Sequence, residues 1–108
     1  MSYSIKTIPS FDKQLKKLVK KYPSFRSEFL LFVTSLYENP LQGTSLGNQC
    51  YKIRIAIQSK GKRKSSGARI ISHIIIQEET IYLISVYDKS TIGNITDFEI
   101  KKLINEID

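Results

Sequence analysis

Three apolar runs with strand composition lie close together in the second half of the chain, and they constrain the fold more than any other feature. They span residues 51–58, 68–77 and 80–86 and are rich in isoleucine and other β-branched or aromatic side chains. Glu78-Glu79 joins the last two runs, which predicts a tight hairpin, and the polar, glycine-bounded segment 59–67 joins the first two. Connections this short favour antiparallel pairing, so the sequence predicts a sheet built around these strands.

Two helices are expected before these strands. Apolar residues recur at helical spacing over residues 11–22 and again over residues 25–36, and a proline ends each pattern. A short strand, residues 4–8, is expected first, with Ser10 as the N-cap of the first helix. Because almost nothing separates the two helices, they should pair as a hairpin whose aromatic stripes belong to the core.

The rest of the chain supplies a loop and a final helix. Residues 41–49 contain two glycines and are expected to form a loop. Thr96 and Glu99 have the spacing of a capping box, and the apolar residues after them predict a helix as far as Ile107. In chain order these elements predict one α+β domain over residues 1–108. An N-terminal strand and a two-helix hairpin pack on a mainly antiparallel four-stranded sheet, and a helix ends the chain.

The net charge of +7 originates entirely in the middle of the chain. No Asp or Glu occurs between Asn39 and Gln77, whereas outside this window ten Lys and Arg balance ten Asp and Glu. Seven basic residues lie inside it: Lys52, Arg54, Lys60, Lys62, Arg63, Lys64 and Arg69. Such an excess is unfavourable through self-repulsion unless a polyanion or an acidic protein binds it. A solvated surface is the alternative, but the charges interleave with strand residues, which favours an anionic partner.

Cysteine and histidine counts exclude several kinds of site. The single Cys50 cannot form an internal disulfide, and with the single His73 it cannot complete a tetrahedral zinc site. We therefore expect no metal and no cofactor. The sequence also shows no signal pattern and no apolar run long enough to span a bilayer, so a cytoplasmic protein without a membrane partner is expected.

Candidate binding residues gather on one face of the first predicted strand of the later group. Lys52 and Arg54 alternate with isoleucines, so their side chains share a face and lie roughly 6.6 Å apart along the strand. Two cations at this spacing can hold oxygens of one phosphate or of neighbouring phosphates. Arg69 opens the next strand and can join them if its side chain lies on the same face. A solvated outer face of the sheet is the competing interpretation.

The last strand ends in a hydroxyl, a carboxylate and an ammonium, contributed by Tyr87, Asp88 and Lys89. Strand ends that face a concavity are common places for chemistry, but ordinary packing competes for Tyr87 and a loop or cap role competes for Asp88. His73 lies four residues from Arg69, roughly 13 Å along a strand, so the two cannot share one phosphate. We expect His73 to be structural or merely exposed.

Several segments together resemble the RelE/ParE toxin superfamily, and its RelE and HigB-type branch most closely. They are Lys52-Ile-Arg54, Gly61-Lys62, Lys64-Ser-Ser-Gly-Ala-Arg69-Ile-Ile and Ile84-Ser-Val-Tyr87-Asp-Lys89-Ser, preceded by Phe11-Asp12-Lys13, Tyr22-Pro23-Ser24 and Glu38-Asn39-Pro40. The resemblance covers nearly the whole chain in the expected order. It implies the toxin of a type II toxin–antitoxin system: a metal-independent endoribonuclease (an mRNA interferase) that cuts messenger RNA on the ribosome, inhibits translation and is held inactive by an acidic protein antitoxin.

The same resemblance implies roles for individual residues. Lys52 and Arg54 would bind phosphate, with Lys52 also a candidate base, and Arg69 would stabilise the transition state. Tyr87 or Lys89 would donate the proton to the leaving oxygen. The loop residues Lys60, Lys62, Arg63 and Lys64 would hold RNA backbone irrespective of sequence. RelE itself has a tyrosine in the C-terminal segment, and here residues 92–96 contain none, so Tyr87 is the candidate substitute.

Two other functions are compatible with the same fold. The first is a ParE-like poison of DNA gyrase, against which the basic residues of the second and third strands argue. The second is a non-catalytic RNA-binding module. Cleavage of messenger RNA inside codons would support the nuclease, and gyrase-trapped DNA breaks would support the poison.

Overall fold

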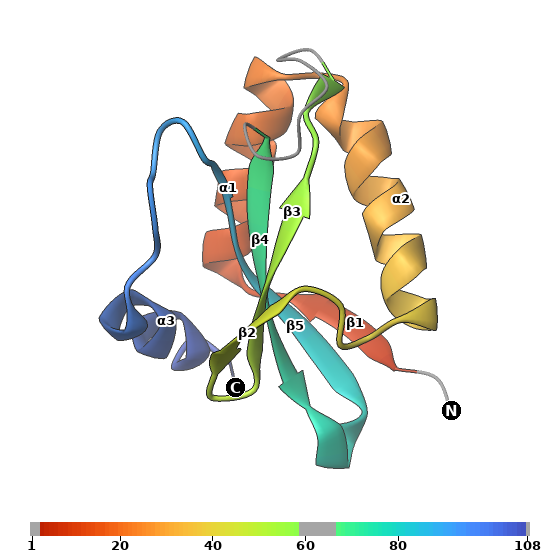
Figure 1. The fold of residues 1–108 in the computed structure, drawn as a ribbon, viewed down its shortest axis with the longest axis vertical. Helices are drawn as coiled ribbons and strands as arrows, with labels where there is room; N and C mark the ends of the chain where they lie inside the picture. Colours follow the sequence, from red (N-terminus) through yellow and green to blue (C-terminus); the bar gives the residue numbers. More distant parts are fainter. Residues whose placement is uncertain (1–2, 59–66, 108) are drawn as a thin grey trace.

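The computed structural model describes residues 3–58 and 67–107, and in them one five-stranded sheet is accompanied by helices (Figure 1). The strands are β1 (Ser4–Thr7), β2 (Thr44–Gly47), β3 (Cys50–Ile55), β4 (Ala68–Ile75) and β5 (Thr80–Asp88), in the sheet order β1-β5-β4-β3-β2. The α-helices are α1 (Pro9–Lys21), α2 (Phe25–Glu38) and α3 (Asp97–Ile104). β1 is parallel to β5 and every other pair is antiparallel, so the α+β class and the mainly antiparallel sheet are confirmed.

The expected number of four strands is wrong, because part of segment 41–49 forms β2 rather than a loop. Thr44 is paired with Lys52 of β3 in an antiparallel register. Asn48 and Gln49 close the turn to β3 with φ angles of 53° and 60°. A four-residue edge strand that ends in glycine has little strand signal of its own, and its pairing with β3 decides its conformation.

The hairpin between β4 and β5 forms as expected. A 3₁₀ turn, Ile76–Glu78, leads into Glu79, which has a left-handed φ of 49°. The two strands pair from Ala68 opposite Asp88 to Ile75 opposite Thr80, with one register shift next to Ile71. This pairing is the longest in the sheet and forms its centre.

The helical pair forms over the expected ranges, but α1 begins earlier than predicted. Its first residue is Pro9 and its N-cap is Ile8, so Ser10 is not the N-cap. Proline fits the first helical position because its fixed φ suits the helix and the N–H that it lacks is not needed there. The aromatic stripes belong to the core, as expected. The ring centroid of Phe29 lies 5.9 to 6.5 Å from those of its aromatic neighbours on α1 and α2.

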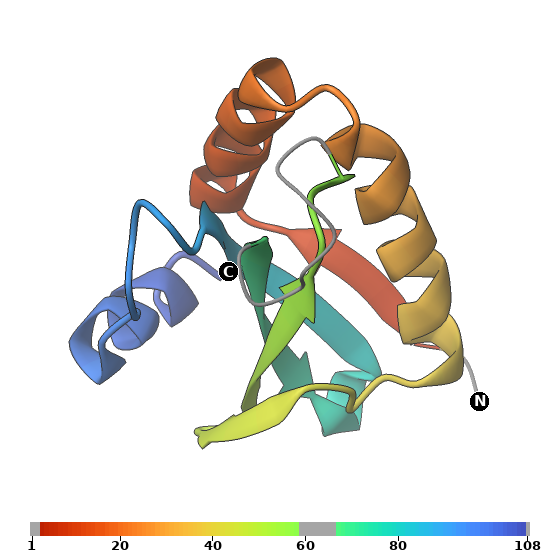
Figure 2. The same cartoon turned by 45° about the horizontal axis from the view of Figure 1, so that its top comes forward.

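Strand alternation gives the sheet two different faces. Ile53 and Ile55 are buried on the face that the helical pair covers, and Asp88 on the same face accepts a hydrogen bond from Tyr22 at the end of α1. Lys52 and Arg54 point to the second face. The segment after β5 carries α3 away from the helical pair, and α3 packs against this second face (Figure 2).

The helix α3 begins with the predicted capping box. The Thr96 side chain accepts from the backbone N–H of Glu99 at 3.1 Å, and the Glu99 carboxylate accepts from the backbone N–H of Thr96 at 3.2 Å. No helix in the described ranges is long and apolar enough to cross a membrane.

Candidate functional site

Three of the candidate residues form one row across the centre of the sheet. Arg54 on β3 is registered opposite Arg69 on β4, and Arg69 is registered opposite Tyr87 on β5. Directly opposite residues of antiparallel strands share a face, with Cβ atoms about 4.5 to 5.5 Å apart. We call Arg54, Arg69 and Tyr87 the cross-strand row.

Lys52 lies beside the cross-strand row rather than in it. It is two residues from Arg54 on the same face, and its register partners are Ile71 on β4 and Thr44 on β2. Its side chain is half-buried, whereas that of Arg54 is exposed. One anion can therefore approach both side chains from the open side of β3.

Arg69 is the most enclosed cation of this group, with 3% of its surface exposed. Burial lowers the pKa of the guanidinium, the positive charge of Arg54 lowers it further and Tyr87 raises it. Because a guanidinium loses its proton only far above neutral pH, Arg69 remains a cation. Its Nη1 donates to the Ala68 carbonyl at 3.2 Å. Two guanidinium groups on neighbouring strands repel each other, and an anion between them relieves that repulsion.

The conformation of the chain just before Arg69 depends on a close backbone approach. A Cβ at Gly67 would lie 2.2 Å from the Ile55 carbonyl oxygen and 2.9 Å from the Ala56 Cα. Only glycine permits this contact, which brings the start of β4 against the end of β3. Gly67 therefore helps to set the register that brings Arg69 opposite Arg54.

The Tyr87 hydroxyl is buried and has no hydrogen-bond partner among residues 3–58 and 67–107. Burial raises the pKa of Tyr87, Arg69 opposes this rise and Glu99 adds to it. The nearby backbone N–H of Ile95 also lowers the pKa, although it does not reach hydrogen-bonding geometry with the hydroxyl oxygen. The balance raises the pKa, so the phenol is neutral at physiological pH and can act as a proton donor.

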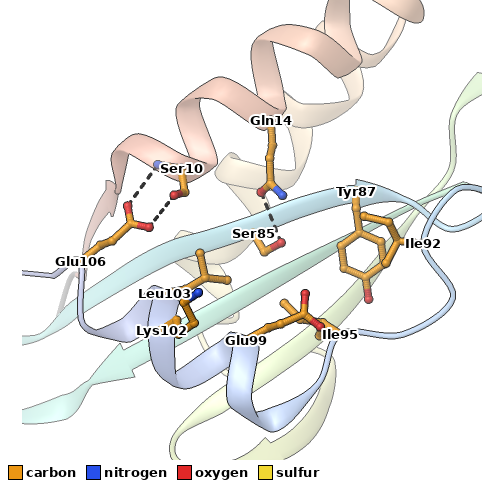
Figure 3. A pocket seen from close by; sticks show the side chains of 10 residues that line it. All are labelled: Ser10, Gln14, Ser85, Tyr87, Ile92, Ile95, Glu99, Lys102, Leu103 and Glu106. Atoms are coloured by element: carbon orange, nitrogen blue, oxygen red, sulfur yellow. Dashed lines mark hydrogen bonds between the residues drawn. The ribbon is translucent and has the colours of Figure 1, made fainter.

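A cavity of about 500 Å³ lies between α1, β5 and α3, and Tyr87 forms part of its wall (Figure 3). On the α1 side, the Gln14 Oε1 accepts from the backbone N–H of Val86 at 3.1 Å and from the Ser85 hydroxyl at 3.3 Å. On the α3 side, Glu106 accepts from the backbone N–H of Ser10 at 3.3 Å and from its hydroxyl. α3 is thus tied to α1 on one side of Tyr87, so access to the phenol depends on where α3 lies.

Asp88 and Lys89 have partners away from the cross-strand row. Asp88 is 6% exposed and accepts from the Tyr22 hydroxyl at 3.1 Å and from the backbone N–H of Ser90 at 3.0 Å. It therefore holds the end of β5. This is the loop or cap role that was the alternative to a chemical role for Asp88. The Lys89 ammonium donates to the Gly93 carbonyl at 2.7 Å. Of the two side chains, only that of Tyr87 lies in the cross-strand row.

Sequence reasoning missed the groups that surround Tyr87. The sequence pattern marks Glu99 only as part of a capping box, and it gives no sign of a role for Gln14. Both reach the site through packing of helices against β5, for which no local sequence signal exists. The loop cations Lys60, Lys62, Arg63 and Lys64 lie outside the described residues, and their role stays a prediction. In the described ranges no three His, Cys, Asp or Glu side chains are grouped so as to hold a metal ion.

No protein-family profile matches this sequence, but solved structures of bacterial toxins do. A mutant of the Escherichia coli toxin RelE in the free state is 20% identical, with a TM-score of 0.63 and 99% of both chains covered. The isolated E. coli RelE toxin is 19% identical, with a TM-score of 0.53 over 95% of this chain and 97% of that one. A metal-bound toxin from Helicobacter pylori is 22% identical, with a TM-score of 0.50 over 83% and 98%.

These likenesses concern the fold, because all three identities are low. The chain has the architecture of a small bacterial toxin, with one α+β domain built on a mainly antiparallel sheet. More specifically, it has the RelE-like fold, which agrees with the resemblance seen in its motifs.

Proposed function

We propose that this protein is the toxin of a type II toxin–antitoxin pair and that it is a metal-independent endoribonuclease that cleaves messenger RNA on the ribosome. The observation that carries the proposal is the cross-strand row on a RelE-like sheet. It combines two guanidinium groups with a neutral phenol in one line, beside an amine from Lys52. Such a set can bind a phosphodiester and also protonate a leaving oxygen.

The reaction that suits this set is attack by an RNA 2′-hydroxyl on the adjacent phosphorus. The bond from the 2′-oxygen to phosphorus forms, the bond from phosphorus to the 5′-oxygen breaks, and a 2′,3′-cyclic phosphate results. Lys52 accepts the 2′-hydroxyl proton as the general base. Tyr87 gives its proton to the departing 5′-oxygen. Arg54 and Arg69 bind the non-bridging oxygens, where negative charge grows in the transition state.

The position of α3 adds a condition to this mechanism. Because the Tyr87 hydroxyl is buried beside the start of α3, the 5′-oxygen can reach it only when the segment around Ile95, just before α3, moves aside. α3 is eight residues long, and hydrogen bonds from Ser10 to Glu106 hold the residues just after it. Because Ile100 of α3 is buried in the core, α3 itself and the residues after it keep their place when RNA binds.

The partners follow from the charge. A positive face with Arg54 and Lys52, and with the Arg69 charge buried next to it, suits RNA phosphates. It equally suits an acidic protein antitoxin that covers the face and blocks RNA. The predicted loop cations would extend this surface along the RNA backbone. Because the proposed partners are messenger RNA, the ribosome and an antitoxin, the proposed place of action is the cytoplasm.

The test is cleavage by purified protein incubated with translating ribosomes, followed by mapping of RNA 5′ ends and chemical analysis of the new termini. We expect cuts inside codons that leave a 2′,3′-cyclic phosphate and a 5′-hydroxyl, and no cut where the attacking 2′-hydroxyl is replaced by hydrogen. Arg69→Ala should abolish cleavage. Arg26→Ala, which removes an exposed arginine on α2 away from this face, should leave cleavage unchanged.

Other outcomes point to the rival functions. Intact messenger RNA together with gyrase-trapped DNA breaks would identify a ParE-like poison. Growth arrest that survives both Arg69→Ala and Tyr87→Phe without any RNA cleavage would identify a non-catalytic binding module.

A further inference from the structure

A second hollow lies on the same face of the sheet, on the side of α3 away from Tyr87. Its volume is about 480 Å³, within the range of small-ligand sites. The β2–β3 turn, β4 and the end of α3 form its walls. The residues that line it are Asn48, Gln49, His73, Lys101, Ile104 and Asn105. None of them takes part in the proposed cleavage chemistry.

The register of the sheet places this hollow next to the phosphate-binding cations. Cys50 is registered opposite His73, and it is two residues from Lys52 and four from Arg54 on the same face of β3. Measured along the strand direction, His73 therefore lies roughly 7 Å from Lys52 and roughly 13 Å from Arg54. An RNA strand whose cleaved phosphate lies at the cross-strand row and which continues along β3 brings a neighbouring nucleotide to the hollow.

The lining groups match what a nucleobase offers. Asn48, Gln49 and Asn105 carry amides that can donate and accept hydrogen bonds, which is how proteins read the edges of unpaired RNA bases. Ile104 provides an apolar wall for a base face. Lys101 is exposed at the rim, where an ammonium can meet the next phosphate.

His73 is held in place by a neighbour outside the hollow. Its Nδ1 lies 3.3 Å from the Cys50 Sγ, and a hydrogen bond to the Asn48 backbone partly offsets the effect of burial on the pKa of His73. Burial lowers the pKa of His73 and raises that of Cys50 to about 11, so at neutral pH the pair is an imidazole and a thiol without charge. A neutral imidazole can read the N–H groups or acceptors of a base without attracting a phosphate instead.

The turn that carries two of the amides is also well anchored. Asn48 and Gln49 both have left-handed φ angles, and the Gln49 carbonyl accepts from the backbone N–H of Ile74 on β4 at 2.9 Å. The amide-bearing turn is thereby tied to the strand that carries His73. A recognition site needs its polar groups held in this way before the ligand arrives.

We propose that the hollow lined by His73, Gln49 and Asn105 is a base-recognition subsite that receives the nucleobase next to the cleaved phosphate and sets the base preference of cleavage. This inference rests on the proposed function. It assigns binding of one nucleobase to residues that lie outside the cross-strand row.

A binding experiment tests the subsite without requiring catalysis. The ligands are short, fluorescently labelled ribo-oligonucleotides with one 2′-deoxy position at the cut site, so that they bind without being cleaved. In a series of these oligonucleotides, an abasic residue replaces each nucleotide in turn. The affinity of each oligonucleotide is measured by fluorescence anisotropy. Wild-type protein should lose about tenfold in affinity when the abasic residue occupies one particular position. The double variant Gln49→Gly/Asn105→Ala should bind the intact oligonucleotide more weakly and show no further loss at that position.

The variants are chosen to preserve the fold. Glycine keeps the left-handed conformation available at position 49, and Asn105 is an exposed C-cap residue with an ordinary helical φ. Asn39→Ala is the matched control, because Asn39 is the exposed C-cap of α2, outside this hollow. An unchanged thermal midpoint confirms folding. If the double variant unfolds, Asn105→Ala and Lys101→Gln are tested singly.

Mapping of cut sites on ribosomes separates the subsite from the proposed function. The double variant should still cleave, but without the preference of the wild-type protein at one base position. If cleavage continues with the wild-type preference, or if the abasic penalty is the same in both proteins, the subsite is wrong while the nuclease proposal stands. If the wild-type protein neither binds nor cuts RNA, both proposals are overturned.

Discussion

The facing guanidinium groups of Arg54 and Arg69 are unfavourable for folding and useful for binding. Like charges directly opposite each other in a sheet destabilise it, whereas an anion that arrives between them removes the repulsion. The fully buried hydroxyl of Tyr87 belongs to the same pattern, because it has no hydrogen-bond partner in the part of the chain that the structure describes. Residues that lower stability in this way are typical of a site that is completed by its ligand.

Tyr87→Phe tests whether this hydroxyl serves chemistry rather than folding. Removal of a buried hydroxyl that makes no hydrogen bond should leave the free energy of unfolding unchanged or raise it by up to about 1 kcal/mol. Cleavage should fall roughly 10² to 10⁴-fold, because the leaving oxygen loses its acid. Urea unfolding and single-turnover cleavage measure the two effects.

Tyr51→Phe is the matched control, since Tyr51 lies on β3 but faces the helical pair. It should leave the cleavage rate unchanged. A large drop in stability for Tyr87→Phe would instead give the hydroxyl a structural role.

The buried Cys50 makes stability depend on alkaline pH. Burial raises the pKa of its thiol from 9.0 to about 11, so the folded state resists ionisation that the unfolded state allows. Stability that is fully present below pH 9 should therefore fall as pH rises to about 11, by roughly 2 kcal/mol in total. Urea unfolding at successive pH values measures this slope, and Cys50→Ala should flatten it. A slope that is identical in wild type and Cys50→Ala would contradict the assignment to this thiol.

At the scale of elements, the junction of β3 and β4 decides whether the cross-strand row forms. The two strands meet at Ala68 and Ile55, directly after Gly67, whose Cβ position is filled by the Ile55 carbonyl. By contrast, β2 is a short edge strand. Its loss would affect the hollow lined by His73, Gln49 and Asn105 more than the cross-strand row. A backbone contact therefore helps to position β4, the element that carries Arg69, together with the packing of its buried isoleucines.

Gly67→Ala should destabilise the protein by about 1 to 3 kcal/mol, because the added methyl group forces the β3 and β4 backbones apart. RNA cleavage should fall as well, since Arg54 and Arg69 lie within two residues of the disturbed contact. Gly93→Ala serves as the control, because a Cβ there meets nothing within 4 Å. Equal stability of the two variants, measured by urea unfolding, would show that the contact is not restrictive.

At the scale of the whole molecule, helices cover both faces of the sheet but leave the side of β3 that carries Arg54 open. α1 and α2 cover one face, and α3 covers the part of the other face nearest β5 (Figures 1 and 2). The charge of +7 is concentrated in the segment that includes β3 and the start of β4. The open, positive part of the molecule therefore lies at Arg54 and Lys52, beside the buried Arg69 and Tyr87 of the cross-strand row.

This distribution predicts a strong dependence of RNA affinity on salt. Each phosphate contact should contribute a slope of about −0.7 to a plot of log affinity against log salt concentration for single-stranded RNA. Arg54→Gln should make the slope shallower by about that amount, while Arg26→Gln on the far side should leave it unchanged. Anisotropy titrations between low and moderate salt measure this. An Arg54→Gln slope equal to that of the wild type would remove Arg54 from the phosphate contacts.

Local sequence determined the helices, the central strands and the facing of their side chains. Helix periodicity, the Thr96 capping box and the alternation of isoleucines with Lys52 and Arg54 are properties of neighbouring residues, and so they can be read without a structure. The same pattern correctly assigned Arg54 to the face away from the helical pair.

Tertiary structure alone decided the register, the fifth strand and the surroundings of each reactive group. That Arg69 lies opposite both Arg54 and Tyr87, that α3 covers the phenol, and that His73 shares a hollow with Gln49 all depend on pairing between segments distant in the chain. Such pairing depends on how all the backbone hydrogen bonds and the apolar surface are satisfied together. No single stretch of sequence contains that information.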